Sequence, residues 1–580
     1  MLTRWGRDLD PTNPLPEYPR PQLVRERWAN LNGRWDHAFT EGEDRPACWA
    51  GPIVVPFSPE CELSGVGRQL KPDERLWYRR AFTWSRQARP TNAERTLLHF
   101  GAVDQTCTVW VNGHEVGRHT GGYLPFTFEV TDALVEGENL LEVRVRDLSE
   151  TGVHARGKQR LDRGTIWYTA QSGIWQTVWL EPVPEQYVER LVLVPHLEDA
   201  ELEVTVVSSR AHGAARVTVA GTTTEIPVGV ASRLPIADVR LWTPDDPHLY
   251  DVEVALGADR VTSYAAMRSF GVSSTHPRRL LLNGEPFAHV GVLDQGYWPD
   301  GLLTAPSDAA MVHDIETMKG LGFTVLRKHV KIEPLRWYHH CDRLGMLVWQ
   351  DMVNGGSRYR WLTTQRPARR WSPIPDRLHV LFGRTDRSGR QEFRAEVRAT
   401  VELLRGVPCL AVWTPYNEGW GQFAANATAR EVAALDPSRP VNHVSGWVDQ
   451  GGGDLRSFHR YGKPFRMPRR QGRRALALTE YGGASLRLAD HDWSDRDCDD
   501  RIYGYLPLAD RDHFDRHFAA LHVPLVAAAR QGLAATIYTQ LSDVEDELNG
   551  LLTWDREVLK LDADIVRGVT AAMRSAMIEE

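Results

Sequence analysis

The first third of the chain alternates apolar and polar residues over short runs that end at turn residues. This period of two is typical of β-strands with one buried face. The dipeptide Asn112-Gly113 predicts a tight hairpin between TVWV and HEVG. We therefore predict an antiparallel two-sheet sandwich of jelly-roll type over residues 1–184. Its strand-like runs are LWYRRAFTW, RTLLHFGAV, CTVWVNGHEVGRH, LPFTFEV, NLLEVRVRD and IWQTVWLEP.

A second β-rich stretch begins at Tyr187 and extends to about Ser274. Its length and strand spacing predict an immunoglobulin-like sandwich with a core of its own, over residues 185–274. The runs are VERLVLVP, ELEVTVVSS, ARVTVAG, HLYDVEVAL and RVTSYAAMRSFGV.

After about Thr275, continuous apolar runs alternate with segments of helical period. This order is typical of βα units around a parallel sheet. We predict a (β/α)8 barrel over residues 275–580, with its chemistry at the C-terminal ends of the strands. The eight candidate strands are PFAHVGVL, FTVLRKHV, MLVWQDM, CLAVWTPYN, PVNHVSG, DLRSFHRY, ALALTEYGG and AATIYTQL. The helical segments are SDAAMVHDIETMKGLG, EPLRWYHHCDRLG, QEFRAEVRATVELLRG, AANATAREVAALD and HFDRHFAALHVPLVAAARQG.

Composition excludes several classes of function. The 580 residues are 42% hydrophobic and 25% charged, with a net charge of −7, as in ordinary soluble globular proteins. Sixty-nine basic against 76 acidic residues leave no excess charge for a phosphate backbone, so nucleic acid is not an expected partner. The first residues carry charges and prolines, and no long apolar run follows. We expect a cytoplasmic protein with no membrane partner.

The six cysteines are scattered and form no C-x-x-C motif. We expect reduced, mostly buried thiols. The chain contains no His/Cys cluster with zinc spacing and no acidic cluster that indicates a particular metal. We therefore expect no metal and no cofactor.

Two glutamates follow predicted barrel strands. Glu418 follows the fourth strand in CLAVWTPYNEGW, and Glu480 ends the seventh in RALALTEYGG. Both would reach the mouth of the barrel, where glycoside hydrolysis needs one carboxyl as proton donor and another as nucleophile or base. A strand-end glutamate is also often solvated or ion-paired, so the pattern alone leaves both interpretations open.

The motifs around these glutamates resemble those of glycoside hydrolase family 2, the family of β-galactosidases, β-glucuronidases and β-mannosidases. The resemblance extends from about Trp28 to Asp555. It implies a jelly-roll sugar-binding domain, an immunoglobulin-like sandwich and a catalytic barrel. The matching stretches are LNGRWDHAF, LWYRRAF, LHFGAVDQTCTVWVNGHEVGRHTGGYLPFTFEVTD, ENLLEVRVRD, SGIWQTVWLE, RSFGV, LLLNGEPF, YNE and TEYG.

The resemblance also implies roles for single residues. Glu418 resembles the general acid/base and Glu480 the nucleophile of a double displacement. Asn417 resembles the asparagine that contacts the sugar 2-hydroxyl. Tyr461 resembles the tyrosine that donates a hydrogen bond to the nucleophile; a tyrosine of the core or rim is the alternative.

Three further groups lie at predicted strand ends. Arg327 and His329 resemble a family segment Arg-x-x-His, although the histidine is one position closer here. Arg327 would hold a catalytic carboxylate ionised, or else form a structural ion pair. Asp294 after the first strand and Asp351 after the third would bind substrate hydroxyls; a loop acid or helix cap is the alternative for each.

Departures from the family bear on the substrate. β-Glucuronidases resemble one another in an Asn-x-Lys that binds the sugar carboxylate, and this chain has Glu547-Leu548-Asn549 there, which disfavours a glucuronidase. Thr539-Gln540-Leu541 replaces an aromatic residue expected after the eighth strand. Another sugar-stacking surface could come from Trp413, Trp420 and Trp447. Packing in the core is the alternative for each. Lys328 and Lys331 keep an acidic sugar open as a minority interpretation.

We expect a retaining exo-β-glycosidase of β-galactosidase type that acts on a carbohydrate substrate. A uronide hydrolase, a β-mannosidase, a transglycosidase or a catalytically inactive carbohydrate-binding protein are the alternatives, and a homo-oligomer is possible. The long segment between Asp351 and about Arg390 is rich in Gly, Pro and Arg. It is interpreted as a lid or subsite wall, or as a flexible surface insertion.

Overall fold

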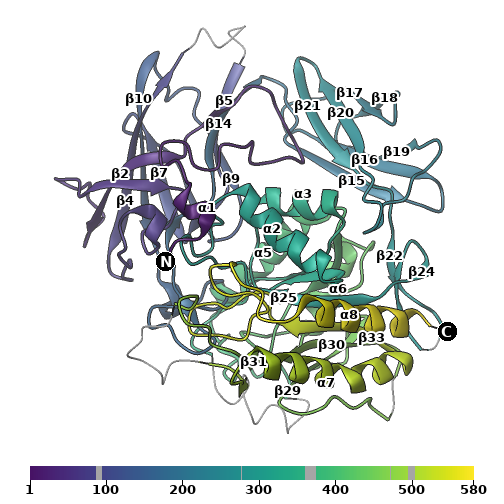
Figure 1. Cartoon of the computed structure of the whole chain (residues 1–580). Coiled ribbons are helices and arrows are strands. Elements are labelled where there is room, and N and C mark those ends of the chain that lie inside the picture. The colour runs from purple at the N-terminus through teal and green to yellow at the C-terminus, as the bar shows by residue number, and fades with distance from the viewer. Residues whose placement is uncertain (86–93, 276, 360–373, 470–471, 494–502, 580) are drawn as a thin grey trace.

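The computed structural model describes the chain except residues 86–93, 276, 360–373, 470–471, 494–502 and 580. Figure 1 shows two β-sandwiches next to each other above a C-terminal parallel sheet and its helices. This is the predicted order of architectures. The ranges 1–184, 185–274 and 275–580 remain our proposed domains.

The N-terminal sandwich has a six-stranded sheet in the order β3-β2-β4-β10-β7-β8 and a four-stranded sheet in the order β1-β14-β5-β9. Inward side chains such as Trp35, Val109 and Val143 form its core. Asn112 and Gly113 have φ angles of 50° and 82°, the left-handed pair that a two-residue hairpin requires, so the predicted turn is confirmed. The strands are β1 (Ala29–Asn30), β2 (Gly33–Thr40), β3 (Gly51–Val55), β4 (Arg75–Trp84), β5 (Glu94–Phe100), β7 (Thr106–Val111), β8 (His114–Thr120), β9 (Phe126–Glu129), β10 (Gly137–Arg146) and β14 (Val178–Pro184).

The second sandwich packs a three-stranded sheet, β15-β16-β19, against a four-stranded sheet, β18-β17-β20-β21. Its own apolar core includes Val204, Val217 and Val252. Exposed and buried residues alternate along β17, as predicted for a strand with one solvated face. The strands are β15 (Arg190–His196), β16 (Glu201–Val207), β17 (Ala214–Val219), β18 (Thr222–Pro227), β19 (Ser232–Pro235), β20 (Tyr250–Leu256) and β21 (Asp259–Ala265).

The C-terminal part is built on a seven-stranded sheet in the order β28-β27-β26-β25-β33-β30-β29, in which every pair of neighbours is parallel. All residues of β28 and β30 are buried, because helices and the barrel interior cover both faces of a parallel sheet. The strands are β25 (His289–Asp294), β26 (Val325–Lys328), β27 (Leu347–Asp351), β28 (Leu410–Thr414), β29 (Leu455–Tyr461), β30 (Ala475–Gly482) and β33 (Leu533–Thr539).

The predicted fifth strand lies between the two ends of this sheet. Val441 and Ser445 form parallel bridges with Trp413 and Asn417 on the β28 side. On the other side, the Asp454 amide donates to Val441 O at 2.8 Å, and Ser445 Oγ lies 2.7 Å from the Nε2 of His459 on β29. The sheet is thus connected into a ring at all eight predicted strand positions.

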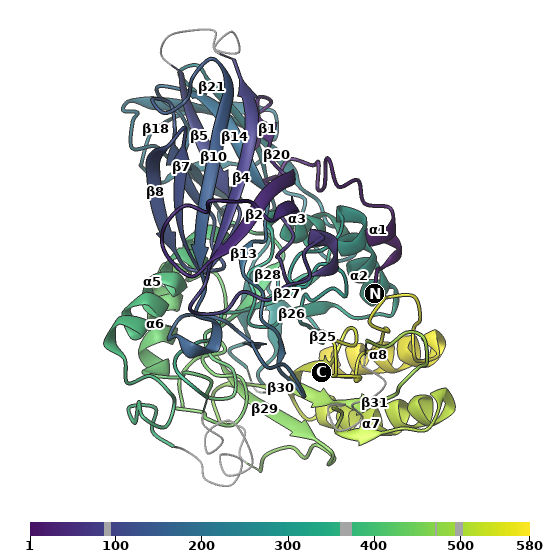
Figure 2. The same cartoon turned by 90° about the vertical axis from the view of Figure 1, so that its left-hand side faces the viewer.

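Helices cover the outside of this ring, and each predicted helical segment is found. Ser307 caps α2 by accepting from the Ala310 amide, and Gly345 ends α3 in the left-handed conformation. Helix α8, which packs beside α7 in Figures 1 and 2, was not predicted. The helices are α2 (Asp308–Gly320), α3 (Leu335–Leu344), α5 (Arg387–Leu404), α6 (Ala425–Leu435), α7 (Arg511–Arg530) and α8 (Ala563–Ile578).

A loop of the N-terminal sandwich, residues 153–169, reaches the mouth of the C-terminal ring (Figure 2). Ala155 forms an antiparallel bridge with Gly355, which follows β27. Arg163 Nη1 forms an ion pair with Asp546 Oδ2 at 2.7 Å. One wall of the site is therefore supplied by the first sandwich. Shorter elements here and elsewhere are α1 (Arg4–Arg7), η1 (Glu62–Ser64), β6 (Val103–Asp104), η3 (Ser149–Thr151), β11 (Gln159–Arg160), β12 (Tyr168–Thr169), β13 (Gly173–Ile174), β22 (Phe270–Val272), β23 (Leu280–Leu282), β24 (Glu285–Pro286), β31 (Ala484–Ser485) and β32 (Leu506–Pro507).

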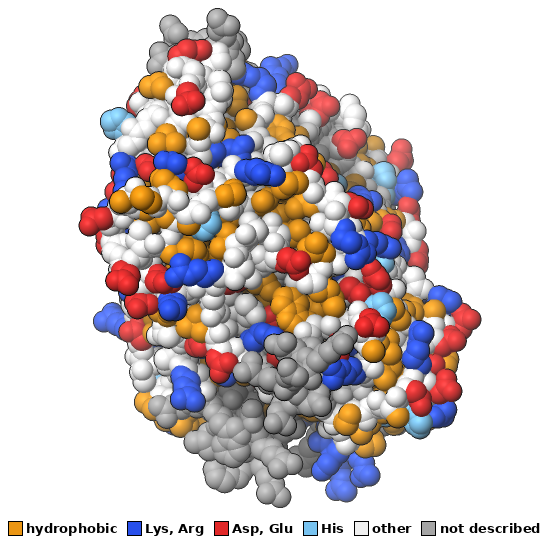
Figure 3. Space-filling model, turned by 60° about the vertical axis from the view of Figure 1, so that its left-hand side comes forward, with side chains coloured by type: hydrophobic (Ala, Val, Ile, Leu, Met, Phe, Trp, Pro, Cys, Tyr) orange, Lys and Arg blue, Asp and Glu red, His pale blue; other side chains and the backbone are white. Residues whose placement is uncertain are grey.

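The surface and the thiols agree with the sequence interpretation where the structure describes them. Basic and acidic side chains are interspersed on the face drawn in Figure 3. Of the five described cysteines, all unpaired, four are buried and Cys48 is exposed. Within the described ranges, every helix is too short or too polar to cross a membrane.

Candidate active site

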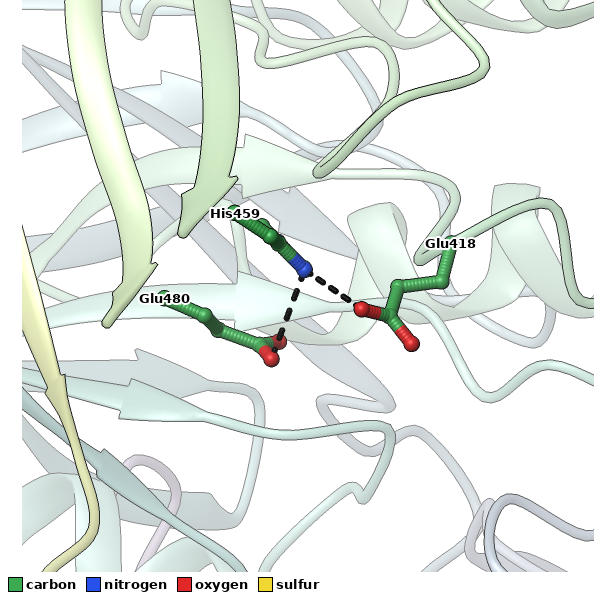
Figure 4. Close-up of side chains that lie close together, drawn as sticks. All are labelled: Glu418, His459 and Glu480. Atoms are coloured by element: carbon green, nitrogen blue, oxygen red, sulfur yellow. Dashed lines mark hydrogen bonds and ion pairs between the residues drawn. The ribbon is translucent and has the colours of Figure 1, made fainter. Parts of the chain in front are cut away.

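Glu418 and Glu480 meet at the C-terminal ends of the strands (Figure 4). Glu480 lies within β30, and Glu418 follows β28 in a left-handed backbone conformation with φ of 47°. One carboxylate oxygen of each residue and a ring nitrogen of His459 all lie within 4.8 Å of one another. Three such groups could also serve as metal ligands, although carboxyl chemistry needs no metal.

Glu480 is surrounded by donors. Tyr461 Oη donates to its Oε2 at 2.5 Å, and Arg327 Nη1 donates to its Oε1 at 3.0 Å. Burial by itself would raise the pKa of this carboxyl. The positive charges of His459 and Arg327, with the Tyr461 hydrogen bond, outweigh burial and lower the pKa to about 2. Glu480 is therefore ionised at neutral pH.

Glu418 has a different environment. Its Oε1 lies 2.7 Å from His459 Nδ1, and its amide donates to Ser445 O at 2.9 Å. Its side chain is 9% exposed. Non-glycine residues with φ near +50° are uncommon and concentrate at functional sites.

Arg327 connects the residues predicted around the nucleophile. Its Nε and Nη2 donate to the two oxygens of Asp351, at 3.1 and 2.9 Å, and Nη2 also donates to Asn417 Oδ1 at 2.8 Å. His329 Nδ1 lies 2.9 Å from Asp351. Burial would raise the pKa of Asp351, but Arg327 and His329 outweigh it and lower that pKa. Asp351 thus orients Arg327 within a buried network.

Because Asn417 Oδ1 accepts from Arg327, its Nδ2 donor faces the opposite way. Nδ2 is buried and, among the described residues, has no hydrogen-bond partner. A buried donor without an acceptor is costly in a folded protein. Asn417 is therefore prepared to donate to a ligand oxygen beside the two glutamates.

Asp294 belongs to a separate buried charge cluster. Lys328 Nζ donates to Asp294 Oδ2 at 2.6 Å and to Glu333 Oε1 at 2.7 Å, and Lys331 Nζ donates to the same Glu333 oxygen at 2.7 Å. Both lysines have carboxylate partners inside the protein. The interpretation of Lys328 and Lys331 as ligands of an acidic sugar is therefore wrong, because neither ammonium is available to a substrate.

Comparisons with known proteins show similarity to one family of enzymes. Two models match: "Glycosyl hydrolase 2 galactose-binding domain-like" over residues 66–173, and "Glycosyl hydrolases family 2" over residues 186–272. The chain is 23% identical over 395 residues to a β-galactosidase of Thermoanaerobacter pseudethanolicus, covering 63% of this chain. It is 28% identical over 411 residues to one of Vibrio cholerae serotype O1, covering 65% of this chain. In these segments the chain is similar to proteins of glycoside hydrolase family 2.

Solved structures extend the likeness to the whole fold. A family 2 β-galacturonidase from Eisenbergiella tayi has a TM-score of 0.70 at 18% identity, covering 96% of this chain and 98% of its own. A β-glucuronidase from an uncultured Clostridium sp. has a TM-score of 0.74 at 17% identity, covering 96% and 99%. The chain spans only 48% and 37% of the two curated β-galactosidases, about half their length or less.

The predicted tryptophans differ in their surroundings. Trp413 is fully buried and donates from Nε1 to Asp436 at 2.9 Å, so it belongs to the core. Trp420 is buried against Tyr359, with ring centroids 5.8 Å apart. Trp447 is half-buried, and its ring centroid lies 5.6 Å from that of His459. Trp447 is therefore the best placed of the three to contact a sugar.

Sequence reasoning missed two residues of the site. His459 lies two positions before Tyr461 on β29, so both side chains share a face of the strand, and that spacing could have revealed it. Tyr505 stacks on Tyr461 with centroids 3.8 Å apart and an interplanar angle of 7°. It comes from a loop, and no local pattern in the sequence indicates this contact.

The segment that resembles the uronate-binding region of β-glucuronidases is held by contacts within this protein. Asn549 Nδ2 donates to Glu547 Oε1 at 3.0 Å, and Tyr168 of the first sandwich donates to Glu547 Oε2. Lys158 Nζ lies 3.7 Å from the same carboxylate. A glutamate with its own partners therefore occupies this place. Residues 360–373 of the predicted lid lie outside the described residues, so the lid remains a prediction.

Proposed function

We propose that this protein is a retaining β-glycosidase. The single observation that supports this most is the separation of Glu418 and Glu480, whose oxygens lie within 4.8 Å. Retaining glycosidases hold their two carboxyl groups about 5 to 5.5 Å apart, whereas inverting enzymes leave about 6.5 to 9.5 Å for a water molecule.

In this mechanism the ionised Glu480 attacks the anomeric carbon while the bond to the leaving oxygen breaks. Glu418 donates its proton to that oxygen, and a glycosyl ester forms on Glu480. Glu418 then takes a proton from water, whose oxygen attacks the anomeric carbon and releases Glu480. Asn417 Nδ2 donates to the sugar 2-hydroxyl, a hydrogen bond that strengthens in the transition state.

For the substrate we propose a terminal neutral sugar, with a β-galactoside first. Among the cations of the described site, Arg327, Lys158, Lys328 and Lys331 each pair with a carboxylate. A sugar carboxylate would also meet Glu547, and bringing two carboxylates together is unfavourable. Two of the curated relatives are named β-galactosidases.

The test is hydrolysis of aryl β-glycosides (galactoside, mannoside, glucuronide, galacturonide and arabinopyranoside) by the purified protein and by Glu480→Gln. We expect turnover of the galactoside that is lost in the variant. A 2-deoxy-2-fluoro galactosyl fluoride should add one sugar mass to wild type and none to Glu480→Gln. Activity confined to a uronide would replace the substrate, and activity retained in the variant would contradict the mechanism.

A further inference from the structure

His459 stands between the two catalytic candidates, as Figure 4 shows. Its Nδ1 lies 2.7 Å from Glu418 Oε1 and 3.4 Å from Glu480 Oε2, and its side chain is 0% exposed. In the sheet, His459 is the register partner of Glu480. One ring nitrogen thus contacts both carboxylates.

The other ring nitrogen also faces an acceptor. Ser445 Oγ donates to Thr479 Oγ1 at 2.9 Å, and Thr479 Oγ1 donates to Phe458 O at 3.4 Å. A hydroxyl has one hydrogen to donate, so Ser445 Oγ, 2.7 Å from His459 Nε2, accepts from that nitrogen. With acceptors at both nitrogens, the hydrogen bonds are satisfied when the ring carries both protons.

We propose that His459 is a positioning residue that supplies one positive charge to whichever of the two carboxylates is ionised. This inference rests on the proposed double displacement. Before attack, Nδ1–H forms its hydrogen bond with Glu418, and the positive charge of the ring lies 3.4 Å from the ionised Glu480. When Glu480 becomes an uncharged glycosyl ester, the same N–H stabilises Glu418, which has just lost its proton and must act as the base.

The surrounding charges are compatible with this role. Arg327 donates to Oε1 of Glu480, whereas His459 lies near Oε2. Burial lowers the pKa of His329, which pairs with Asp351 and not with Glu480. The titratable groups near the ring are Glu418 after β28, Glu480 on β30, Tyr461 on β29, Arg327 on β26, His329 directly after β26, and Tyr505 before β32.

The experiment compares pH profiles of kcat/KM for wild type, His459→Asn and His443→Asn. Asparagine retains a donor at the place of Nδ1 but carries no charge. Removing a cation raises the pKa of a neighbouring carboxyl, so both limbs of the His459→Asn profile should move to higher pH, the alkaline limb by at least about one unit. His443 is a matched control, because this buried histidine lies near Asp449, not near the two glutamates.

The outcomes separate the two proposals. A His459→Asn profile that is lower but not displaced, in a variant that unfolds at the wild-type temperature, overturns the role of His459 and leaves the glycosidase proposal intact. Displacement in both histidine variants also overturns it. If wild type hydrolyses no aryl glycoside of the panel and is not labelled by the fluoro sugar, the proposed function itself is overturned.

Discussion

At the scale of single residues, the site assigns separate donors to the two oxygens of Glu480. Arg327 donates to Oε1 and Tyr461 to Oε2. Both interactions favour the ionised carboxylate, and together they resist the effect of burial. A nucleophile in this state needs no base to activate it, so the proton chemistry is left to Glu418.

Replacing Tyr461 by phenylalanine removes one donor and keeps the ring that stacks on Tyr505. The pKa of Glu480 should then rise toward its ordinary value, and the acid limb of kcat/KM, which requires ionised Glu480, should move to higher pH by up to about one unit. Tyr481→Phe is the control, because its hydroxyl faces His522 Nε2 at 2.8 Å. Equal profiles in the two variants would contradict the assignment.

Asn417→Ala should lower kcat/KM by roughly 10²- to 10³-fold, the usual effect of losing one transition-state donor. The effect should nearly vanish on a 2-deoxy glycoside, because that substrate lacks the hydroxyl that Nδ2 contacts. Steady-state kinetics with both substrates and both proteins gives the coupling. A loss of equal size on the two substrates would mean that Asn417 acts only by holding Arg327.

At the scale of elements, the sequence predicted all eight strand positions because buried parallel strands are continuous apolar runs. The fifth position consists of isolated bridges at Val441 and Ser445 and is not a regular strand. The hydrophobic pattern of a sequence does not distinguish the two. Helix α8 was not predicted, although its apolar period is as marked as that of α6 and α7, which were. Glu418 and Glu480 were found at strand ends, whereas Tyr505 depends on tertiary contact alone.

The contact between loop 153–169 and the segment after β27 depends on Gly355. A Cβ there would lie 1.9 Å from the backbone oxygen of His154, so the two segments would have to separate. The neighbouring Asn354 accepts from the Asn417 amide at 3.1 Å. Gly355→Ala should therefore destabilise the protein by about 1–3 kcal/mol and lower kcat/KM by at least roughly tenfold.

Gly568 provides the opposite case within α8. A Cβ at this position meets no atom within 4 Å. Gly568→Ala should stabilise the protein by about 0.5–1 kcal/mol without changing kcat/KM, because alanine favours the helical backbone. Chemical denaturation and kinetics of the two alanine variants provide the comparison. Similar stability changes of the same sign would contradict the packing argument for Gly355.

At the scale of the whole molecule, a buried ion-pair cluster joins the N-terminal segment to both sandwiches. Arg25 is 5% exposed and donates to both oxygens of Asp259 on β21, at 3.0 and 2.8 Å, and to Glu181 on β14 at 2.9 Å. Burial would raise the pKa of Glu181, but nearby cations lower it well below its usual range. This buried ion-pair cluster thus links the two sandwiches to each other.

Arg25→Met should leave two buried carboxylates short of a partner and lower the free energy of unfolding by about 3–5 kcal/mol. Arg210→Met tests the contrast, because Arg210 pairs with Glu129 and Glu185 at an exposed surface, where an ion pair contributes about 0–1 kcal/mol. In calorimetry, Arg25→Met should unfold at a clearly lower temperature than Arg210→Met. Activity below that temperature should persist, because the residues of the site come from the barrel and loop 153–169. Equal unfolding temperatures would show that apolar packing, rather than this cluster, joins the sandwiches.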